Sequence, residues 1–243
     1  MKYLFFLFLL AISALTKAQP SHKDFDLLLK KHVDDKGGVN YKAFKNDTDI
    51  LNDYLVEMML EPPSRDWSDD EKLAYWINVY NALTIQLVLK YYPIKSIKDI
   101  GSSIQIPFVN TPWDVKCFEV KDGEELSLNN IEHGIIRKDF EEPRIHFALV
   151  CAAVSCPKLL NEAYDPARLN AQLTTQTKGF LANTSKNKIS IDRLELSKLF
   201  SWYGGDFRKN GTLVDFLNPY TSVKIDSKAK TSFLDYDWNL NEQ

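Results

Sequence analysis

The sequence is poor in cysteine, with three in 243 residues, and it lacks several signatures that would assign a chemistry. It contains no glycine-rich phosphate loop, no G-x-S-x-G nucleophile elbow, no C-x-x-C pair and no H-E-x-x-H motif. It also lacks an excess of either charge, because the net charge is −3 and the charged residues are interspersed. This distribution excludes a basic nucleic-acid footprint, so we expect no nucleic-acid partner.

A long apolar run occurs only at the start of the sequence. After Met1-Lys2, residues 3–15 are almost all apolar, and Thr16-Lys17-Ala18 follows. This layout is typical of a cleavable signal peptide, since the run is too short to cross a bilayer comfortably; a retained membrane anchor is the alternative. We predict that residues 1–18 are a signal peptide. The mature chain, 19–243, is then expected to be a single domain without a transmembrane segment, periplasmic or secreted.

The strongest predicted helix begins after Ser68 and ends near Tyr91. Ser68 and Glu71 have the spacing of a capping box, and Pro93 stops the helix. Residues 73–89 contain no charge. A helix that is apolar nearly all round is buried nearly all round, so we expect it at the centre of the domain.

Shorter elements surround this helix in mixed order. The patterns predict helices over 21–29, 49–60, 130–140, 166–182 and 213–217, a helix opening at Pro157, a hairpin over 113–120 and 124–128, and strands over 144–151, 189–191 and 233–238. The order has no βαβ rhythm. It favours an α+β fold in which the buried central helix packs against a small, mostly antiparallel sheet, loosely like papain or transglutaminase by analogy alone.

Cys156 is the most informative thiol because it directly precedes the proline that opens a predicted helix. The N–H groups and the dipole of a helix N-terminus lower the pKa of a cysteine there and favour the thiolate. We predict Cys156 to be a nucleophile; the alternatives are a buried capping residue or a disulfide with Cys151. Cys151 is either a small buried hydrophobe or the nucleophile, with Cys156 as its resolving thiol. The pairing of Cys117 stays open.

Two histidines are candidate bases. His146 is at odd spacing from Cys151 on the predicted strand, so the two side chains should lie on opposite faces, and a pairing of His146 with Cys156 stays open. His133 lies one turn before Arg137, where a cation depresses the pKa of a histidine and keeps it neutral. A satisfied structural hydrogen bond is the alternative for each histidine.

Other polar residues are candidates for orienting groups or for substrate binding. Asn78 would orient the histidine or stabilise an oxyanion, and Asn81 would bind substrate, unless both amides tie a neighbouring loop to the buried helix. Arg137 and Arg144 would hold a carboxylate or phosphate, unless they pair with nearby acids. Glu132 is a further substrate-binding candidate, or the third residue of a capping box begun by Asn129.

These residues predict a thiol-dependent hydrolase or an acyl or amide transferase. Cys156 would be the nucleophile, His133 or His146 the base and Asn78 the orienting group, acting on a small molecule or a peptide. The first alternative is a non-catalytic envelope module with a buried polar network. The second is a zinc site formed by both histidines with Cys151 and Cys156, although their spacing fits no recognised zinc pattern. No other cofactor or metal is expected.

The chain resembles the family called domain of unknown function 547. The matching segments are Ala74–Thr84, Leu128–Arg137 with Ile131-Glu132-His133, Arg144–Cys151, Ser155–Leu159, Trp202–Phe207 and Tyr236–Leu240. The resemblance implies a shared fold and says little about activity. Seven of the candidates occupy positions of these motifs, namely Asn78, Asn81, His133, Arg137, His146, Cys151 and Cys156.

Overall fold

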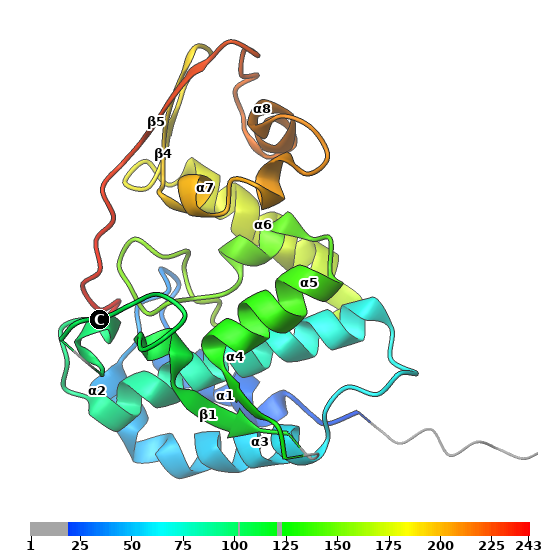
Figure 1. Cartoon of the computed structure of the whole chain (residues 1–243), viewed down its shortest axis with the longest axis vertical. Helices are drawn as coiled ribbons and strands as arrows, with labels where there is room; N and C mark the ends of the chain where they lie inside the picture. Colours follow the sequence, from blue (N-terminus) through cyan, green and yellow to red (C-terminus); the bar gives the residue numbers. More distant parts are fainter. Residues whose placement is uncertain (1–18, 102, 121–122) are drawn as a thin grey trace, which may run out of the picture.

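The computed structural model describes residues 19–101, 103–120 and 123–243, and the predicted signal peptide lies outside these ranges. Helices gather around one long central helix, and a small sheet lies at one end (Figure 1). The combination of helices with two small sheets confirms the predicted α+β class. Across the described ranges, no helix is both long enough and apolar enough to span a membrane.

The central helix is α4 (Asp69–Tyr91), and it begins and ends as the sequence predicts. The Ser68 hydroxyl accepts from the Glu71 N–H, and the Glu71 carboxylate accepts from the Ser68 N–H at 2.6 Å. Every side chain of its charge-free middle, residues 73–89, is buried except that of Gln86. The absence of charge allows burial on all sides, which is why α4 occupies the centre.

The other helices are shorter than α4. They are α1 (Lys23–His32), α2 (Tyr41–Phe44), α3 (Thr48–Leu60), α5 (Arg137–Asp139), α6 (Leu169–Ala182), α7 (Leu199–Trp202) and α8 (Leu213–Leu217). Of these, α7 and α8 lie beside the small sheet at one end of the molecule (Figure 1). A π-helical segment, η4 (Asn130–Ile136), runs directly into α5. Single 3-10 turns complete the list: η1 (Lys45–Asp47), η2 (Ile97–Asp99), η3 (Pro112–Asp114), η5 (Pro143–Phe147), η6 (Pro166–Arg168), η7 (Asp206–Arg208) and η8 (Asn218–Tyr220).

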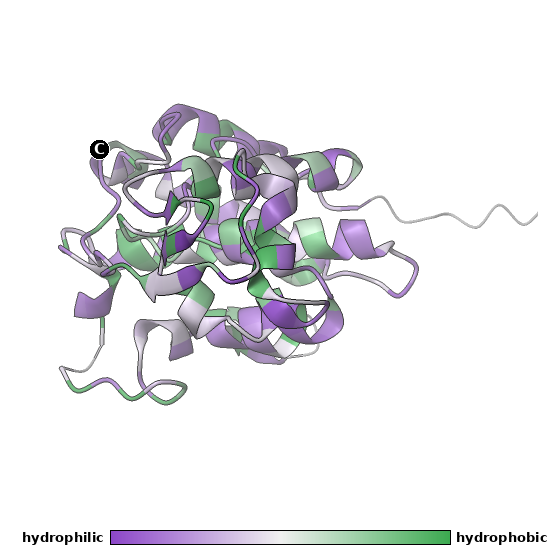
Figure 2. Ribbon diagram, turned by 90° about the horizontal axis from the view of Figure 1, so that it is seen from above, coloured by the Kyte–Doolittle hydropathy of each residue, from purple (hydrophilic) through white to green (hydrophobic). Residues whose placement is uncertain are grey.

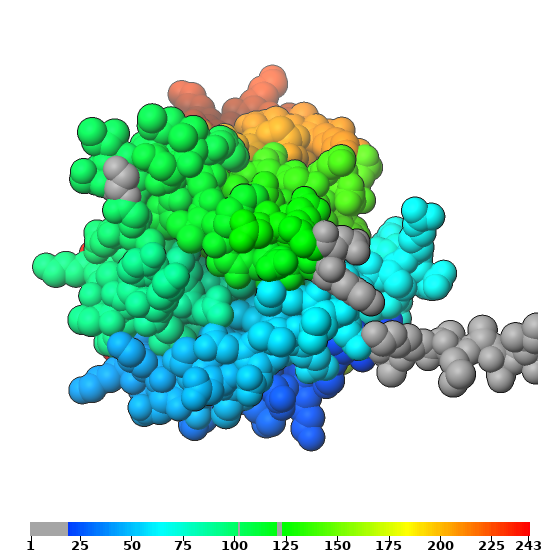
Figure 3. All heavy atoms as spheres, turned by 60° about the horizontal axis from the view of Figure 1, so that its bottom comes forward, coloured from blue at the N-terminus to red at the C-terminus, as the bar shows by residue number. Residues whose placement is uncertain are grey.

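The first third of the chain forms a helical layer on one side of α4. Tyr75 of α4 donates its hydroxyl to the Met58 carbonyl of α3 at 2.7 Å, which fixes these two helices together. The blue and cyan segments of this layer pack directly against the green segments near residues 100–140 (Figure 3). The outer helices carry both hydrophilic and hydrophobic stretches (Figure 2), as expected for elements with one buried face.

The strands form two separate sheets. β1 (Lys116–Glu119) and β2 (Glu125–Ser127) make the predicted antiparallel hairpin. In the second sheet, β3 (Lys188–Ile189) pairs antiparallel with β4 (Arg193–Leu196), which pairs parallel with β5 (Lys230–Phe233). Mostly antiparallel pairing is therefore confirmed.

Of the two sheets, the hairpin of β1 and β2 packs against α4, because Phe118 of β1 contacts Trp76 of α4 with ring centroids 6.4 Å apart. The three-stranded sheet belongs to another part of the core. Its apolar side chains join a second cluster centred on Phe147, Phe180 and Phe200. The flanks of α4 are covered also by α2, α3, η4 and η6. A helix that is apolar on all sides can be enclosed by helices and loops as well as by a sheet.

The segment 144–151 does not form the predicted strand. It begins in the 3-10 turn η5 and continues as irregular chain, buried from Ile145 to Val150. The Asn81 amide donates to the Ala148 carbonyl and accepts from the Val150 N–H, both at 3.0 Å. A side chain of α4 thus satisfies backbone groups that a neighbouring strand would otherwise have to satisfy.

The C-terminal segment returns from the sheet to the helical region. In Figure 1 it descends from β5 along one side of the molecule and ends near α2. Of the strand predicted over 233–238, only Phe233 lies in a strand. Single bridges join Leu240 to Ala153 and Glu242 to Val39, so this segment fastens the loop after residue 151 to the N-terminal helices.

Candidate functional site

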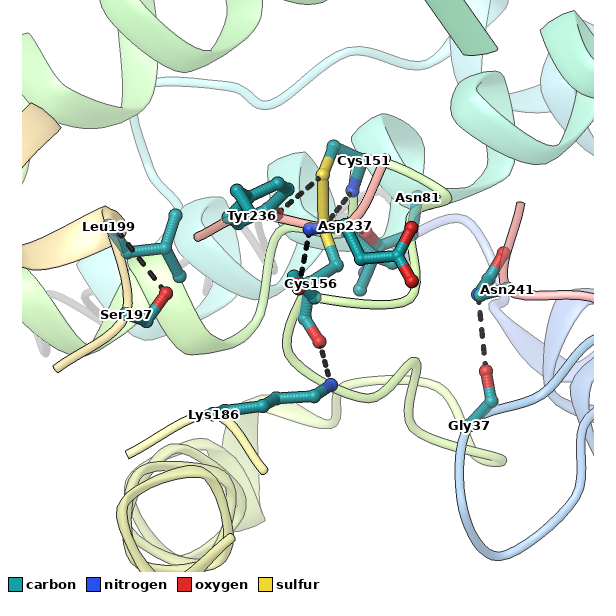
Figure 4. Close-up of a disulfide and its surroundings, with 12 residues drawn as sticks. Gly37, Asn81, Cys151, Cys156, Lys186, Ser197, Leu199, Tyr236, Asp237 and Asn241 are labelled. Carbon is teal, nitrogen blue, oxygen red and sulfur yellow. Dashed lines mark hydrogen bonds between the residues drawn. A yellow bond between two sulfur atoms is a disulfide. The ribbon is translucent and has the colours of Figure 1, made fainter. Parts of the chain in front are cut away.

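A disulfide joins Cys151 to Cys156 and closes a short loop. The chain turns through Ala152, whose φ of 57° lies in the left-handed region, and the Cys156 N–H donates to the Ala153 carbonyl at 3.0 Å. Lys186 donates to the Cys156 carbonyl behind the loop (Figure 4), and burial lowers the pKa of Lys186 to about 8. This turn is the sharp one that a bond between these two cysteines requires.

The predicted helix cap at Cys156 is absent. Residues 157–160 have no regular structure, so no helix begins at Pro157 and no helix dipole acts on the sulfur. Cys156 is 2% exposed, whereas Cys151 is half-buried and its Sγ lies 3.2 Å from the Tyr236 hydroxyl. The expectation of a helix-activated Cys156 thiolate is therefore wrong, and Cys151 is the more accessible sulfur.

The C-terminal segment runs along the disulfide loop and carries two aromatic residues to it. The Val154 N–H donates to the Asn239 carbonyl at 2.8 Å, and the Asp237 N–H donates to the Ser155 hydroxyl at 2.9 Å. These bonds fix the backbone on either side of Tyr236 and Trp238. The two rings pack on each other with centroids 4.6 Å apart.

Both cysteines face a cavity of about 210 Å³. Six of its fourteen lining residues are tyrosines or tryptophans, and the lining comes from elements far apart in the sequence. The lining residues are Tyr80, Trp113, Asn129, Glu132, His146, Leu149, Cys151, Cys156, Pro157, Leu199, Trp202, Tyr203, Tyr236 and Trp238. Four of the predicted candidates therefore line this cavity: Glu132, His146 and the two bonded cysteines, Cys151 and Cys156.

His146 is held by Asp206 of η7. Its Nε2 lies 2.7 Å from Oδ2 of Asp206, and its ring stacks on Tyr203 with centroids 3.9 Å apart. Asp206 also receives two hydrogen bonds from the Arg137 guanidinium, at 2.6 and 2.8 Å. The bonds from His146 and Arg137 hold the pKa of Asp206 well below its usual range.

An ionised carboxylate only accepts, so the His146 nitrogen that faces Asp206 carries the proton. In the neutral ring, Nδ1 then has the free lone pair. Among the described residues, none makes a hydrogen bond to Nδ1 of His146, and the residue lines the cavity. Asp206 therefore fixes the orientation of the His146 ring and leaves Nδ1 without a hydrogen bond among the described residues.

His133 lies beside this group but does not line the cavity. Its Nδ1 accepts from the Arg137 guanidinium at 2.7 Å. Burial lowers the pKa of His133, and Arg137 adds to the shift. The predicted depression is confirmed in direction, but the lone pair is used by Arg137, which fits the structural alternative for His133.

Glu132 is buried at the cavity, 5% exposed, and it does not cap the helix. Its Oε2 accepts from the Tyr80 hydroxyl at 3.1 Å, and Tyr203 is a second hydrogen-bond partner. The helix start uses Ser127 instead, whose hydroxyl accepts from the Asn130 N–H at 3.2 Å. The predicted capping box is therefore wrong, because the chain enters a π-helical segment here.

Neither asparagine of α4 reaches the cavity. The Asn78 amide donates to the Tyr164 carbonyl and accepts from the Tyr164 N–H, both at 2.8 Å. Both amide atoms of Asn81 are likewise hydrogen bonded, to the backbone of Ala148 and of Val150. Asn78 has no free amide atom to orient His146 or to meet an oxyanion, so both asparagines fit the alternative of tying loops to the helix.

The two arginines also pair within the protein, and neither lines the cavity. Arg144 donates to both carboxylate oxygens of Glu142, at 2.8 and 2.5 Å, and to Asn170 at 2.8 Å. Arg137 is used by Asp206 and His133. The alternative of arginines paired with nearby acids therefore holds for both.

Of the four predicted zinc ligands, His146, Cys151 and Cys156 line the cavity, whereas His133 does not. Within the described ranges, no three His, Cys, Asp or Glu side chains are arranged to hold a metal ion. The sulfurs of Cys151 and Cys156 are bonded to each other, and Nε2 of His146 is bound to Asp206.

Several residues of the site escaped the sequence analysis. They are Asp206 and the aromatic residues Tyr80, Trp113, Trp202, Tyr203, Tyr236 and Trp238. Asp206, Trp202, Tyr203, Tyr236 and Trp238 stand in the motif segments of the resemblance, which was the available signal. The sequence could not predict that these residues meet, because they are far apart along the chain. Cys151 and Tyr236, for example, are separated by 85 positions.

The fold and the cavity define an α+β protein with a disulfide at the edge of an aromatic pocket. Residues 64–181 match the family described as "Protein of unknown function, DUF547", in agreement with the resemblance seen in the sequence. The match contains α4, Glu132, His146 and both bonded cysteines, whereas Asp206 and the C-terminal aromatic residues lie beyond it. No curated protein and no solved structure matches the chain.

Proposed function

We propose that the protein is a thiol-dependent hydrolase, or a transferase of acyl or amide groups, that acts in the cell envelope. The observation that carries the proposal is the shared cavity of the Cys151–Cys156 pair and a histidine oriented by Asp206. The predicted signal peptide and the disulfide support a site of action outside the cytoplasm. The substrate is a small molecule or a peptide with a carbonyl group that fits the cavity.

Cys151 is the nucleophile in this proposal and Cys156 is the resolving thiol. This assignment follows from exposure, because Cys151 is half-buried while Cys156 is 2% exposed. Nucleophilic attack requires an accessible sulfur. The disulfide form is then the resting, oxidised state of the site.

The reaction begins with reduction of the disulfide by an external dithiol, which gives up two electrons and becomes a disulfide itself. His146 Nδ1 takes the Cys151 proton, and the thiolate attacks the carbonyl carbon of the substrate. The C–S bond forms, the C–N or C–O bond breaks, and the proton passes from His146 to the leaving group. Water or an acceptor amine then gives a proton to His146 and attacks the thioester carbonyl. A new C–O or C–N bond forms, the C–S bond breaks, and the proton returns from His146 to the Cys151 sulfur.

Thiol labelling tests the proposal. After mild reduction with dithiothreitol, iodoacetamide should modify Cys151 with an apparent pKa well below the ordinary value of ~8.5. His146→Ala should return that apparent pKa toward the ordinary value. His133→Ala is the matched control, because His133 does not line the cavity, and it should leave the labelling of Cys151 unchanged. Burial raises the pKa of Cys117 to about 11, so this thiol serves as an internal slow reference.

A covalent intermediate gives the second readout. The reduced protein, mixed with p-nitrophenyl acetate, should gain one acetyl group on Cys151 and release p-nitrophenolate in a burst. Cys151→Ser should abolish both signals while Cys117→Ser retains them. An ordinary pKa for Cys151 together with no acetylation would refute the proposal.

The same measurements bear on a second function, a non-catalytic binding module. The observation in its favour is the burial of Cys156 within a bonded pair, since a buried disulfide is a usual structural crosslink. A disulfide that resists mild reduction in the folded protein would support the module.

A further inference from the structure

Glu132 is the buried acid of the cavity, and its charge acts on the basic side chains of Arg137 and His133 without an ion pair to either. Its partners are the neutral hydroxyls of Tyr80 and Tyr203. Among the residues that the structure describes, no lysine, arginine or histidine forms an ion pair with Glu132, although thirteen other ion pairs are present. A buried carboxylate without an ion-pair partner costs several kcal/mol, which is a reason to look for a partner outside the chain.

Arg137, on which the charge of Glu132 acts, already has an acidic partner in Asp206. Arg137 gives two hydrogen bonds to Asp206 and one to His133. It faces a different small pocket and does not line the cavity of Glu132. The charge of Arg137 is therefore largely balanced by Asp206, and the cavity keeps the negative potential of Glu132.

The walls of the cavity are suited to a cation as well. Six aromatic rings line it, and they belong to Tyr80, Trp113, Trp202, Tyr203, Tyr236 and Trp238. The faces of aromatic rings attract cations, tryptophan most strongly. Glu132 and His146 are the titratable lining residues besides the tyrosines, so the lining contains an acid and no lysine or arginine.

The field of Glu132 reaches across the cavity. Burial is the main cause that raises the pKa of Tyr80, Tyr203 and Tyr236, and the charge of Glu132 raises each of them further. These three residues stand on α4, near η7 and on the C-terminal segment, so the carboxylate acts on several walls at once. A ligand cation in the cavity would therefore be attracted by the negative charge of Glu132.

We propose that the cavity binds a small organic cation, an alkylammonium group enclosed by the aromatic rings and neutralised by Glu132. The inference rests on the proposed function only in using the same cavity, since binding needs no free thiol. In the context of acyl transfer, the cation is part of the substrate or is the amine that accepts the acyl group. The site selects charge through Glu132 and shape through Trp113, Trp202 and Trp238.

A matched pair of ligands tests the inference. The disulfide-bonded protein is titrated with choline and with its neutral isostere 3,3-dimethyl-1-butanol at constant ionic strength, and tryptophan fluorescence is followed. Choline should bind at least about tenfold more tightly than the isostere, as expected from a cation–π and carboxylate site. Equal affinity of the two compounds, or no binding of choline in the millimolar range, would overturn the inference.

Variants locate the effect. Glu132→Gln should lower the affinity for choline about tenfold and leave that for the isostere unchanged. Glu141→Gln changes the net charge equally but lies outside the cavity, so it should leave both affinities unchanged. If Glu132→Gln and Glu141→Gln weaken choline binding equally, the attraction is a general charge effect and the inference fails. The titration uses the disulfide-bonded protein, so its outcome does not depend on whether Cys151 can be labelled after reduction.

Discussion

The asparagines of α4 and the glutamate of the cavity are both buried polar residues, yet their surroundings differ. Both amide atoms of Asn78 are hydrogen bonded to one peptide backbone, and the same holds for Asn81 at a second loop. Glu132 has two neutral hydrogen-bond partners. The comparison separates polar residues that hold two parts of the chain together from one that forms no ion pair among the described residues.

The same contrast appears between the two histidines. His133 uses its Nδ1 lone pair on Arg137, outside the cavity. Nε2 of His146 lies 2.7 Å from Oδ2 of Asp206, its Nδ1 has no hydrogen bond among the described residues, and the residue lines the cavity. Two histidines that are 13 positions apart in the sequence therefore differ in whether Nδ1 has a hydrogen-bond partner.

The largest effect is expected from Asn78→Ala. The substitution leaves the N–H and the carbonyl of Tyr164 without partners in a buried place, so the free energy of unfolding should fall by about 3 kcal/mol. Urea denaturation measures this loss, with exposed Lys90→Ala on the same helix as a control that should change it little. A loss no larger than that of the control would mean that Asn78 does not hold the loop, and the contrast with Glu132 would break down.

Asp206→Asn should have an intermediate effect at neutral pH. The variant keeps an acceptor for His146 but loses the ion pair with Arg137, so the free energy of unfolding should fall by about 2 kcal/mol. The pKa of Asp206 is lowered in the folded state, so its charge stabilises the fold above the unfolded pKa of ~3.9. That stabilisation is lost as the pH falls through the folded value, and the wild-type advantage should shrink below pH ~4.

Thermal denaturation at several pH values checks this expectation. A wild-type advantage that stays constant from neutral to acidic pH would show that the charge of Asp206 is not the source of the stabilisation. In that case the orientation of His146 would have to come from the ring stack with Tyr203.

The smallest effect, and one of opposite sign, is expected from Glu132→Gln without ligand. The glutamine can still accept from Tyr80, and it removes a buried charge that forms no ion pair, so unfolding should require up to about 1 kcal/mol more free energy. Urea denaturation with and without choline sharpens the comparison, because choline should stabilise the wild type and not the variant. A destabilisation like that of Asn78→Ala would place Glu132 among the structural polar residues.

Local signals predicted the central helix well. The capping box, the charge-free middle and the proline after Tyr92 act through neighbouring residues, and they gave the start and the end of α4. The hairpin of β1 and β2 and the helix α6 follow from similar local patterns. These elements need no knowledge of distant parts of the chain.

The prediction failed where a distant side chain replaced a regular partner. The alternating apolar residues of 144–151 suggested a strand, but Asn81 of α4 satisfies the backbone at Ala148 and Val150. Similarly, Cys156-Pro157 resembles a helix start, although the disulfide and the C-terminal segment fix that loop instead. Sequence alone could propose cysteine and histidine as a pair, but Asp206 and Tyr236 come from 60 and 85 positions away.

The turn between the two cysteines has a further kinetic consequence. Its shape is set by the positive φ of Ala152 and by hydrogen bonds to Asp237, Asn239 and Asn241, which do not depend on the sulfur–sulfur bond. After reduction the thiols would therefore remain held near each other at a high effective concentration. Ring closure would then be a fast intramolecular step, and the lifetime of the reduced protein would depend on the surrounding oxidant and not on a search by the chain.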